Sequence, residues 1–151
     1  MILDILSKKG NLLIRSIDSP PVKSEEGTTT INTIGGIVRS GQVLHHKGNL
    51  LFLGDVNPGG SITCTGDIYI LGALRGMAHA GVDGNEDAII AASYLSPTQL
   101  RIAEVISRPP DEWENRETSM EFASLREGIM QIDKISNISR FRKDLNVFRG
   151  V

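Results

Sequence analysis

Apolar residues in the middle of the chain occur in short runs of four or five, and glycines separate these runs at regular intervals. Steps of six residues from Gly36 reach glycine at seven of nine positions as far as Gly84. A closer identity appears at three times that spacing, where Gly-Asn-Leu-Leu-Phe-Leu at 48–53 aligns with Gly-Asp-Ile-Tyr-Ile-Leu at 66–71. Glycine tolerates the positive φ angles that sharp corners require. The pattern therefore predicts an all-β, triangular solenoid with about 18 residues and three short strands per coil.

Alternation within each strand predicts which side chains fill the solenoid. Successive side chains of a strand point to opposite faces, so one alternating set of each face is expected inside. On the first face this set consists of Leu50, Phe52, Ile68 and Ile70. The interior columns expected on the other two faces consist of Val56 and Leu74, and of Leu44, Ile62 and Ala80.

The opposite side of the first face is also apolar, although a solenoid has only one interior. This outward set consists of Leu51, Leu53, Tyr69 and Leu71. A sheet that is apolar on both sides is typical of burial on both sides. The chain itself or a second copy must cover the strip, and a two-fold contact is the commonest way for identical subunits to do so. We therefore predict a homodimer through this face.

The N-terminal segment has a different character from the repeats. Two short apolar runs at 2–6 and 12–17 flank Gly10, and they predict a loose hairpin. Residues 18–33 are polar and contain two adjacent prolines, which is typical of a linker. Residues 1–33 are thus expected to form an N-terminal extension, and the solenoid domain is expected to span 34–135.

The repeat loses its register after Gly84, but apolar runs at 88–92 and 100–106 still predict strands. The charged, Pro-containing segment 107–119 is expected to be a loop. Residues 121–125 and 129–135 then predict a closing hairpin around Arg126-Glu127-Gly128. A helix over 119–135 is the disfavoured alternative, because glycine and β-branched residues lower helix propensity.

The last segment, 136–151, is a basic tail. It contains Arg140, Arg142, Lys143 and Arg149 against a single acid, Asp144. The simpler interpretation is a solvated end of the chain. The alternative is an electrostatic contact with anionic lipid or an acidic partner.

Composition narrows the class of protein. The net charge of −2 and a sequence pI near 5.9 provide no field for binding nucleic acid or an anionic membrane. Cys64 is the only cysteine, which excludes an internal disulfide and fits a reducing cytoplasm. The chain has neither an apolar run of about 18 residues nor a convincing signal peptide. These features favour a cytoplasmic protein.

No catalytic constellation is evident, and we expect no metal and no cofactor. A phosphate-binding Gly-x-x-x-x-Gly-Lys-Ser/Thr loop is absent despite the glycines. His45 and His46 are adjacent in a predicted strand and would point to opposite faces, so they cannot bind one metal ion together. Cys64 has the phase of an interior residue and is interpreted as a small core side chain. The protein is therefore predicted not to be an enzyme.

Two other functions remain open on this pattern. One is an acyltransferase on a hexapeptide-repeat solenoid, with His45, His46 or His79 as general base. Such repeats place an aliphatic residue before nearly every glycine, and here only Leu53, Leu71 and Met77 do so. The other is a plain polymer-forming solenoid, because open ends favour stacking.

One polar run precedes the first clear repeat: Arg39-Ser40-Gly41-Gln42. These residues could simply form a corner, with Ser40 and Gln42 bonded to its amides. They could also form a contact patch, because the planar guanidinium of Arg39 can bond a carboxylate at two places.

These same residues carry a resemblance. Five stretches resemble the C-terminal domain of the septum site-determining protein MinC, in its cyanobacterial and Gram-positive forms. They are the run 39–42, the segments 48–59 and 72–76, the stretch 101–110 and the hairpin 122–132. The resemblance covers about residues 34 to 135. It implies a right-handed triangular β-helix that dimerises through one apolar sheet face.

The resemblance also implies partners. Members of this family bind the membrane-associated ATPase MinD in its ATP-bound dimeric form, and the Arg-Ser-Gly-Gln motif is the recognised contact, here Arg39, Ser40, Gly41 and Gln42. MinD brings them to the inner membrane, where they antagonise assembly of FtsZ. ATP belongs to the partner. The extension 1–33 is shorter than the N-terminal domain that acts on FtsZ in the family, so the resemblance implies dimerisation and MinD binding within the covered region and does not by itself imply direct contact with FtsZ.

Overall fold

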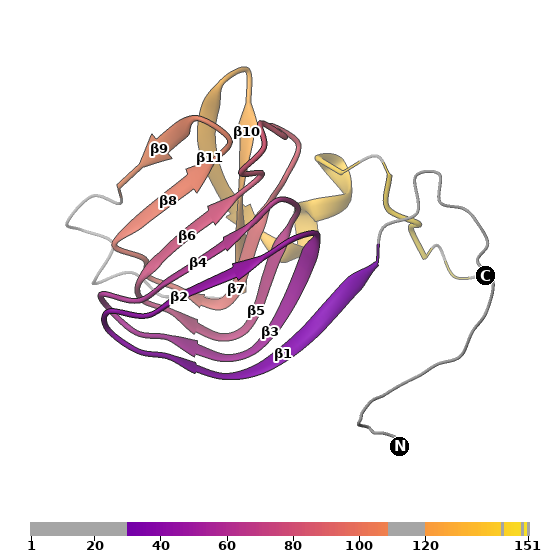
Figure 1. Cartoon of the computed structure of the whole chain (residues 1–151). Coiled ribbons are helices and arrows are strands. Elements are labelled where there is room, and N and C mark those ends of the chain that lie inside the picture. Colours follow the sequence, from indigo (N-terminus) through magenta and orange to yellow (C-terminus); the bar gives the residue numbers. More distant parts are fainter. Residues whose placement is uncertain (1–29, 109–119, 143, 149, 151) are drawn as a thin grey trace. The chain divides into compact units, whose positions relative to one another are not determined.

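The computed structural model describes residues 30–108, 120–142, 144–148 and 150, and their strands form two sheets (Figure 1). The six strands of the first sheet are, in spatial order, β1 (Ile31–Val38), β3 (Asn49–Val56), β5 (Ile68–Leu74), β7 (Ile90–Leu95), β10 (Glu121–Arg126) and β11 (Ile129–Lys134). The five strands of the second are β2 (Val43–His46), β4 (Ser61–Cys64), β6 (Met77–Ala80), β8 (Gln99–Ile102) and β9 (Val105–Ser107). From β1 to β8 the chain alternates between the sheets, so each of these coils adds one strand to both.

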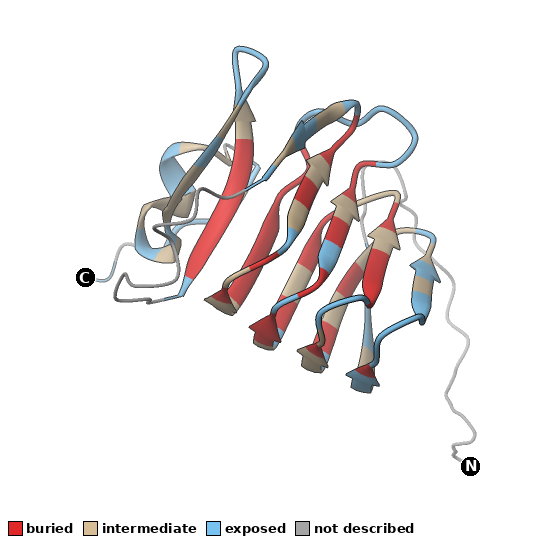
Figure 2. Cartoon of the chain, turned by 90° about the vertical axis from the view of Figure 1, so that its left-hand side faces the viewer, coloured by how far each residue is buried: buried red, intermediate tan, exposed pale blue. Residues whose placement is uncertain are grey.

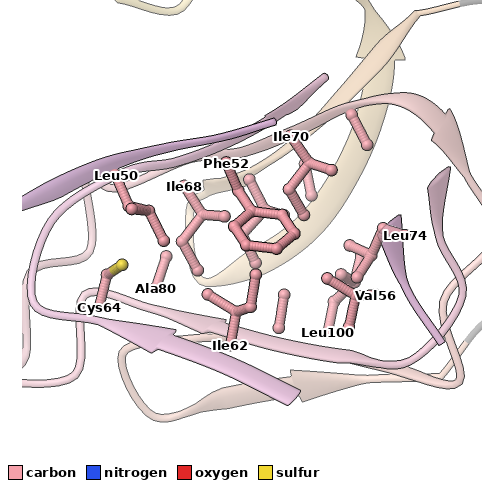
Figure 3. Packing of buried hydrophobic residues seen from close by; sticks show 14 of the residues in the cluster. Leu50, Phe52, Val56, Ile62, Cys64, Ile68, Ile70, Leu74, Ala80 and Leu100 are labelled. Atoms are coloured by element: carbon pink, nitrogen blue, oxygen red, sulfur yellow. The ribbon is translucent and has the colours of Figure 1, made fainter. Parts of the chain in front are cut away.

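The predicted solenoid is confirmed, and so is its repeat in the first coils. Strands β1, β3 and β5 pair in parallel, and each residue lies beside the one 18 positions further on, as with Leu50 and Ile68. The side chains of Leu50, Phe52, Ile68 and Ile70 point into the interior, where each is at most 2% exposed (Figure 3). Burial of these columns is the main favourable term for the fold, about 1.5–3 kcal/mol for each large apolar side chain.

The corners differ from the prediction of three separate strands per coil. Strand β3 runs unbroken through the corner at Gly54, which has a φ of 153°, and Val56 beyond it still pairs with Leu74. A Cβ atom at residue 54 would overlap the carbonyl oxygen of Gly36 on the coil below. Glycine is therefore required there by close stacking of the backbones, and each coil contains one long bent strand and one short strand.

The interior column on the second sheet is only partly as predicted. Leu44 lies beside Ile62, but Ile62 pairs with Ala78 and not with Ala80. The reason is the length of one corner: the connection from β3 to β4 spans 57–60, whereas that from β5 to β6 spans only 75–76. The repeat is shorter by that difference between these two coils, and Ala80 pairs instead with Ile102.

The C-terminal end of the solenoid is closed by antiparallel strands. Strand β10 pairs with β7 and with β11, and the predicted hairpin over 121–135 is confirmed. Its two-residue turn has positive φ angles at Glu127 and Gly128, 54° and 79°, which are the angles of a tight hairpin turn. Strand β9 closes the second sheet in the same way against β8. Burial is lowest in the first coil, where exposed residues dominate β1 (Figure 2).

The tail is docked as far as Arg142, so its interpretation as a solvated end is wrong for that segment, whereas Asp144 and residues 146–148 are exposed, as that interpretation expects. After β11 the chain forms a short 3₁₀ helix, η2 (Ile135–Arg140). Ile138 and Phe141 then pack against Phe122, which is fully buried. Arg142 pairs with Asp67 at 2.9 Å, across 75 residues of sequence.

Several expectations fall outside the described residues: the hairpin at 1–17, the linker as far as residue 29, and most of the loop at 107–119. The first strand begins at Ile31, slightly before the start expected for the solenoid, because 31–33 continue the parallel pairing with β3. Within the described ranges, none of the helices has the length and apolarity to cross a membrane.

Candidate partner-binding surfaces

The corner between β1 and β2 is formed by Arg39, Ser40, Gly41 and Gln42. Buried Val38 ends β1 and fixes the start of this turn. The backbone amide of Arg39 donates to the side-chain Oε1 of Gln42 at 2.7 Å, and the backbone amide of Gln42 donates to the Arg39 carbonyl at 2.9 Å. Gly41 has a φ of 85°, a value that side-chain-bearing residues rarely adopt. The four residues thus form a closed turn with a defined backbone.

The next coil holds this turn in place. The amide of Asn57 donates to the Val38 carbonyl at 2.8 Å, and the amide of Gly41 donates to the Gly59 carbonyl at 2.9 Å. Gly59, with a φ of 87°, lies so close that a Cβ atom there would press on Oγ of Ser40. The corner is therefore preorganised by hydrogen bonds and by close packing of two backbones.

The side chains of this corner face solvent. Arg39, Ser40 and Gln42 are all exposed. The Arg39 guanidinium has no hydrogen-bond or ion-pair partner among the residues that the structure describes. A guanidinium on a rigid turn can form two parallel hydrogen bonds to a carboxylate, with a hydroxyl and an amide beside it. This geometry suits contact with a protein surface.

Sequence reasoning missed the other residues of this surface. Pro58 and Gly59 form the exposed corner of the second coil, and Gly59 lies directly beside Ser40. On the third coil the Arg75 amide donates to the Val56 carbonyl at 2.8 Å, and its guanidinium lies 5.3 Å from the ring centre of Tyr94. The signal was present, because the interval that separates Leu50 from Ile68 also separates Gly41 from Gly59. We call residues 39–42 together with Pro58, Gly59 and Arg75 the polar corner.

The outward side of the first sheet carries the second surface. Leu53 and Leu71 are 44% and 51% exposed, whereas Leu51 and Tyr69 are half-buried. The pairing of Leu51 with Tyr69, and of Leu53 with Leu71, places the four side chains in a block across β3 and β5. A shallow hollow of about 310 Å³ beside them is lined further by Ile31, Met120 and Ile135. We call this block and its hollow the apolar face.

Tyr69 has one polar contact at the edge of this face. Its hydroxyl donates to Oδ2 of Asp67 at 2.9 Å. Burial, followed by the nearby Asp67 carboxylate, raises the pKa of Tyr69 to about 12. The hydroxyl therefore remains a neutral donor at physiological pH.

The three histidines do not form a common site. His45 contacts Thr63, His46 contacts Asn32 at 3.2 Å, and His79 lies 3.0 Å from the Ala103 carbonyl. Burial lowers the pKa of His79, which favours its neutral form as the donor. Across the described ranges, no three His, Cys, Asp or Glu side chains gather in a way that could hold a metal ion. Cys64 is buried, and burial raises the pKa of its thiol to about 12, so it is an inert core residue, as predicted.

The fold and these two surfaces define a class of protein: a β-solenoid that presents a preorganised polar corner and an apolar sheet face, its two candidate surfaces for contacts with other proteins. Residues 32–135 match the family described as septum formation inhibitor MinC, C-terminal domain. The chain belongs to this family, whose members regulate where the division septum forms.

Individual relatives agree with this assignment. The chain is 44% identical over 153 residues to a probable septum site-determining protein MinC from Bacillus velezensis, covering 97% of this chain and 67% of that protein. The corresponding protein of Bacillus mycoides is also 44% identical, over 154 residues, covering 97% of this chain and 68% of that one. Among solved structures, the MinC:MinD cell division protein complex of Aquifex aeolicus contains a similar chain. Its TM-score is 0.68 and its identity 29%, over 75% of this chain and 93% of that one.

Proposed function

We propose that this protein binds the ATP-bound dimer of MinD through Arg39, Ser40, Gly41 and Gln42, and thereby restrains assembly of the septum. The observation that carries the proposal is the unpaired Arg39 guanidinium, among the described residues, on a turn whose backbone is fixed from both coils. The similar chain of known structure comes from a complex of MinC with MinD, which supports MinD as the partner.

The chemistry of the corner favours affinity as well as orientation. Because the turn is already ordered, binding costs little additional backbone entropy. Arginine is enriched among the residues that dominate binding energy at interfaces, where it bonds carboxylates in a bidentate manner. The protein acts in this proposal by binding alone. It makes and breaks no covalent bond, and ATP is held by MinD.

The apolar face provides the second half of the proposal. We infer a homodimer in which Leu51, Leu53, Tyr69 and Leu71 of two copies pack together about a two-fold axis. A two-fold dimer carries two polar corners and can therefore engage a dimeric partner at two points. Two linked contacts bind more tightly than one, because the second becomes intramolecular.

In this proposal the cellular location of the protein depends on its partner MinD. The protein is cytoplasmic in this proposal and reaches the inner membrane peripherally, through MinD. There it antagonises assembly of FtsZ, so that a septum forms only at the proper site.

Binding to MinD is tested by substitution at the corner. Arg39→Ala and Ser40→Ala are expected to weaken ATP-dependent co-sedimentation with MinD and liposomes, Arg39→Ala by about tenfold or more. Lys47→Ala is the matched control, since Lys47 is an exposed cation of the same coil that lies outside the polar corner. Wild-type affinity in both corner variants would refute the site, and equal binding without ATP would refute the partner state.

The dimer face is tested separately. Leu71→Glu places a carboxylate in the centre of the apolar face, and we expect a monomer by light scattering on a sizing column. Ile106→Glu is the matched control, because Ile106 is also 51% exposed but lies on β9 of the other sheet. A dimer of unchanged strength in Leu71→Glu would show that another surface joins the copies.

A further inference from the structure

The outward side of the first sheet is apolar well beyond the four residues of the apolar face. The strip continues through Ile89 just before β7, Ala91 on β7 and Phe122 on β10. Each of these side chains is at most 5% exposed. The chain covers this part itself. Phe141 meets Phe122 edge-on, with the ring centres 5.6 Å apart, and the Arg126 guanidinium lies 4.5 Å from the ring centre of Phe141.

The cover is anchored by Arg142. Its Nη1 donates to Oδ2 of Asp67 at 2.9 Å, and its Nε and Nη2 donate to Asp144 at 2.9 and 2.8 Å. The side chains of Arg142 and Asp67 are only 15% and 8% exposed, whereas that of Asp144 is 65% exposed. A largely buried ion pair with defined geometry holds its groups far more firmly than an exposed one.

Asp67 also connects Arg142 to the segment before β7, to Tyr69 on β5 and to the preceding coil. Oδ1 accepts the Ile89 amide at 3.0 Å, and Oδ2 accepts both the Tyr69 hydroxyl and the Arg142 guanidinium. The Asp67 amide in turn donates to Oδ1 of Asn49 on the preceding coil at 2.7 Å. One buried carboxylate therefore joins the tail, the β7 segment and the tyrosine of the apolar face.

Tyr69 lies where the covered and uncovered parts of the strip meet. Its ring packs against the cluster of Ile89 and Phe122 and also lines the open hollow beside Leu51 and Leu71. Ile135, the first residue of η2, has the same two neighbours: it packs against that cluster and lines the hollow. The end of the chain's own cover is thus one wall of the uncovered hollow.

We propose that Ile135, the first residue of the docked tail segment, forms a wall of the homodimer face, and that Arg142 is a positioning residue that holds Tyr69 in this face through Asp67. This inference rests on the homodimer proposed above. The occupant is a second copy, because the hollow is lined entirely by uncharged, almost wholly apolar groups. A second copy presents the same apolar lining, so two copies related by a two-fold axis bury both strips without leaving a charged group unpaired.

The experiment measures the dimer dissociation constant by sedimentation equilibrium. Arg142→Met retains most of the aliphatic stem but removes the bond to Asp67, and we expect the dissociation constant to rise by about tenfold or more. Arg142→Lys keeps a cation for Asp67 and is expected to restore most of the loss. Asp144→Asn is the matched control: it alters only the exposed partner of Arg142, and we expect a change of less than about threefold.

A double-mutant cycle separates positioning from a general structural role. Tyr69→Phe removes the hydroxyl but keeps the ring and the Arg142–Asp67 pair. If Arg142 acts through Tyr69, the effects of Arg142→Met and Tyr69→Phe on the dissociation constant are less than additive. Additive effects overturn the inference, as does the formation of larger species by Arg142→Met, which would mean that the tail only shields the strip.

Two further outcomes keep the test decisive. If Arg142→Met does not fold, Tyr69→Phe alone serves, and a dissociation constant within about twofold of wild type overturns the inference. Leu71→Glu is measured beside them. If it remains a dimer, the proposed face itself is wrong. If it is a monomer while Arg142→Met dimerises normally, only the role of the tail is refuted.

Discussion

Substitution of Gly59 by alanine tests whether the second coil shapes the proposed MinD contact. Gly59 has a φ of 87°, and the new methyl group would press on Oγ of Ser40. The left-handed backbone costs alanine about 1–2 kcal/mol, which corresponds to about 2–8 °C in melting temperature for a chain of this size. The contact itself moves Ser40 away, because the hydroxyl is exposed and free to shift while the Gly59 backbone is held by the Gly41 amide.

Gly128→Ala separates the loss of stability from the loss of MinD affinity. Gly128 has a similar φ of 79°, but a Cβ atom there would meet no other atom within 4 Å, and the residue sits in the turn of the β10–β11 hairpin. Both variants should lose comparable stability in thermal unfolding. Only Gly59→Ala should also lose affinity for MinD, by about tenfold, or about 1.4 kcal/mol. Equal MinD affinity in the two variants, measured by ATP-dependent liposome co-sedimentation, would refute the reasoning.

Two further predictions concern titratable groups whose pKa is shifted by burial. Burial raises the pKa of the Cys64 thiol to about 12, so the thiol should react with dithionitrobenzoate at pH of about 8 only after unfolding in urea. Stoichiometric reaction of the native protein within minutes would contradict this. Burial lowers the pKa of His79 below its ordinary 6.5, so the folded state favours the neutral ring and its contribution to stability falls as the pH drops through 6.5. His79→Gln should therefore lose less melting temperature than the wild type between pH of about 7.5 and 5.5, and an identical pH profile in the two proteins would exclude His79 as the cause.

The sequence was sufficient for the architecture because the solenoid repeats its chemistry at a fixed interval. The positions of Leu50 and Ile68, and the outward side of Leu71, follow from alternation within the strands and from that interval. Prediction failed where the interval changes. Nothing in the apolar pattern indicated that the corner at 75–76 is shorter than the one before it, so Ala80 was assigned to the place that Ala78 occupies.

The tail illustrates a different limit. Its basic residues left open a contact with an acidic group but did not indicate which one. The partner of Arg142 is Asp67, which is 75 residues distant and looks in the sequence like an ordinary corner residue. A contact of that separation depends on the folded arrangement and has no local signature. The turn at 39–42 has a local signature, because its residues are adjacent in the chain, whereas its neighbour Gly59 on the next coil was not predicted although it lies one full repeat after Gly41.

The shortened corner at 75–76 has a consequence for how this kind of protein can diversify. The coil is shorter there, yet Val56 remains beside Leu74 and Ile62 finds Ala78 as its new neighbour, so the interior stays filled. Corner length is thus uncoupled from core packing between these two coils, because the shorter corner leaves both interior columns paired. The residues proposed to contact MinD lie on such corners, so we expect that this surface can change while the strands of the scaffold keep their packing.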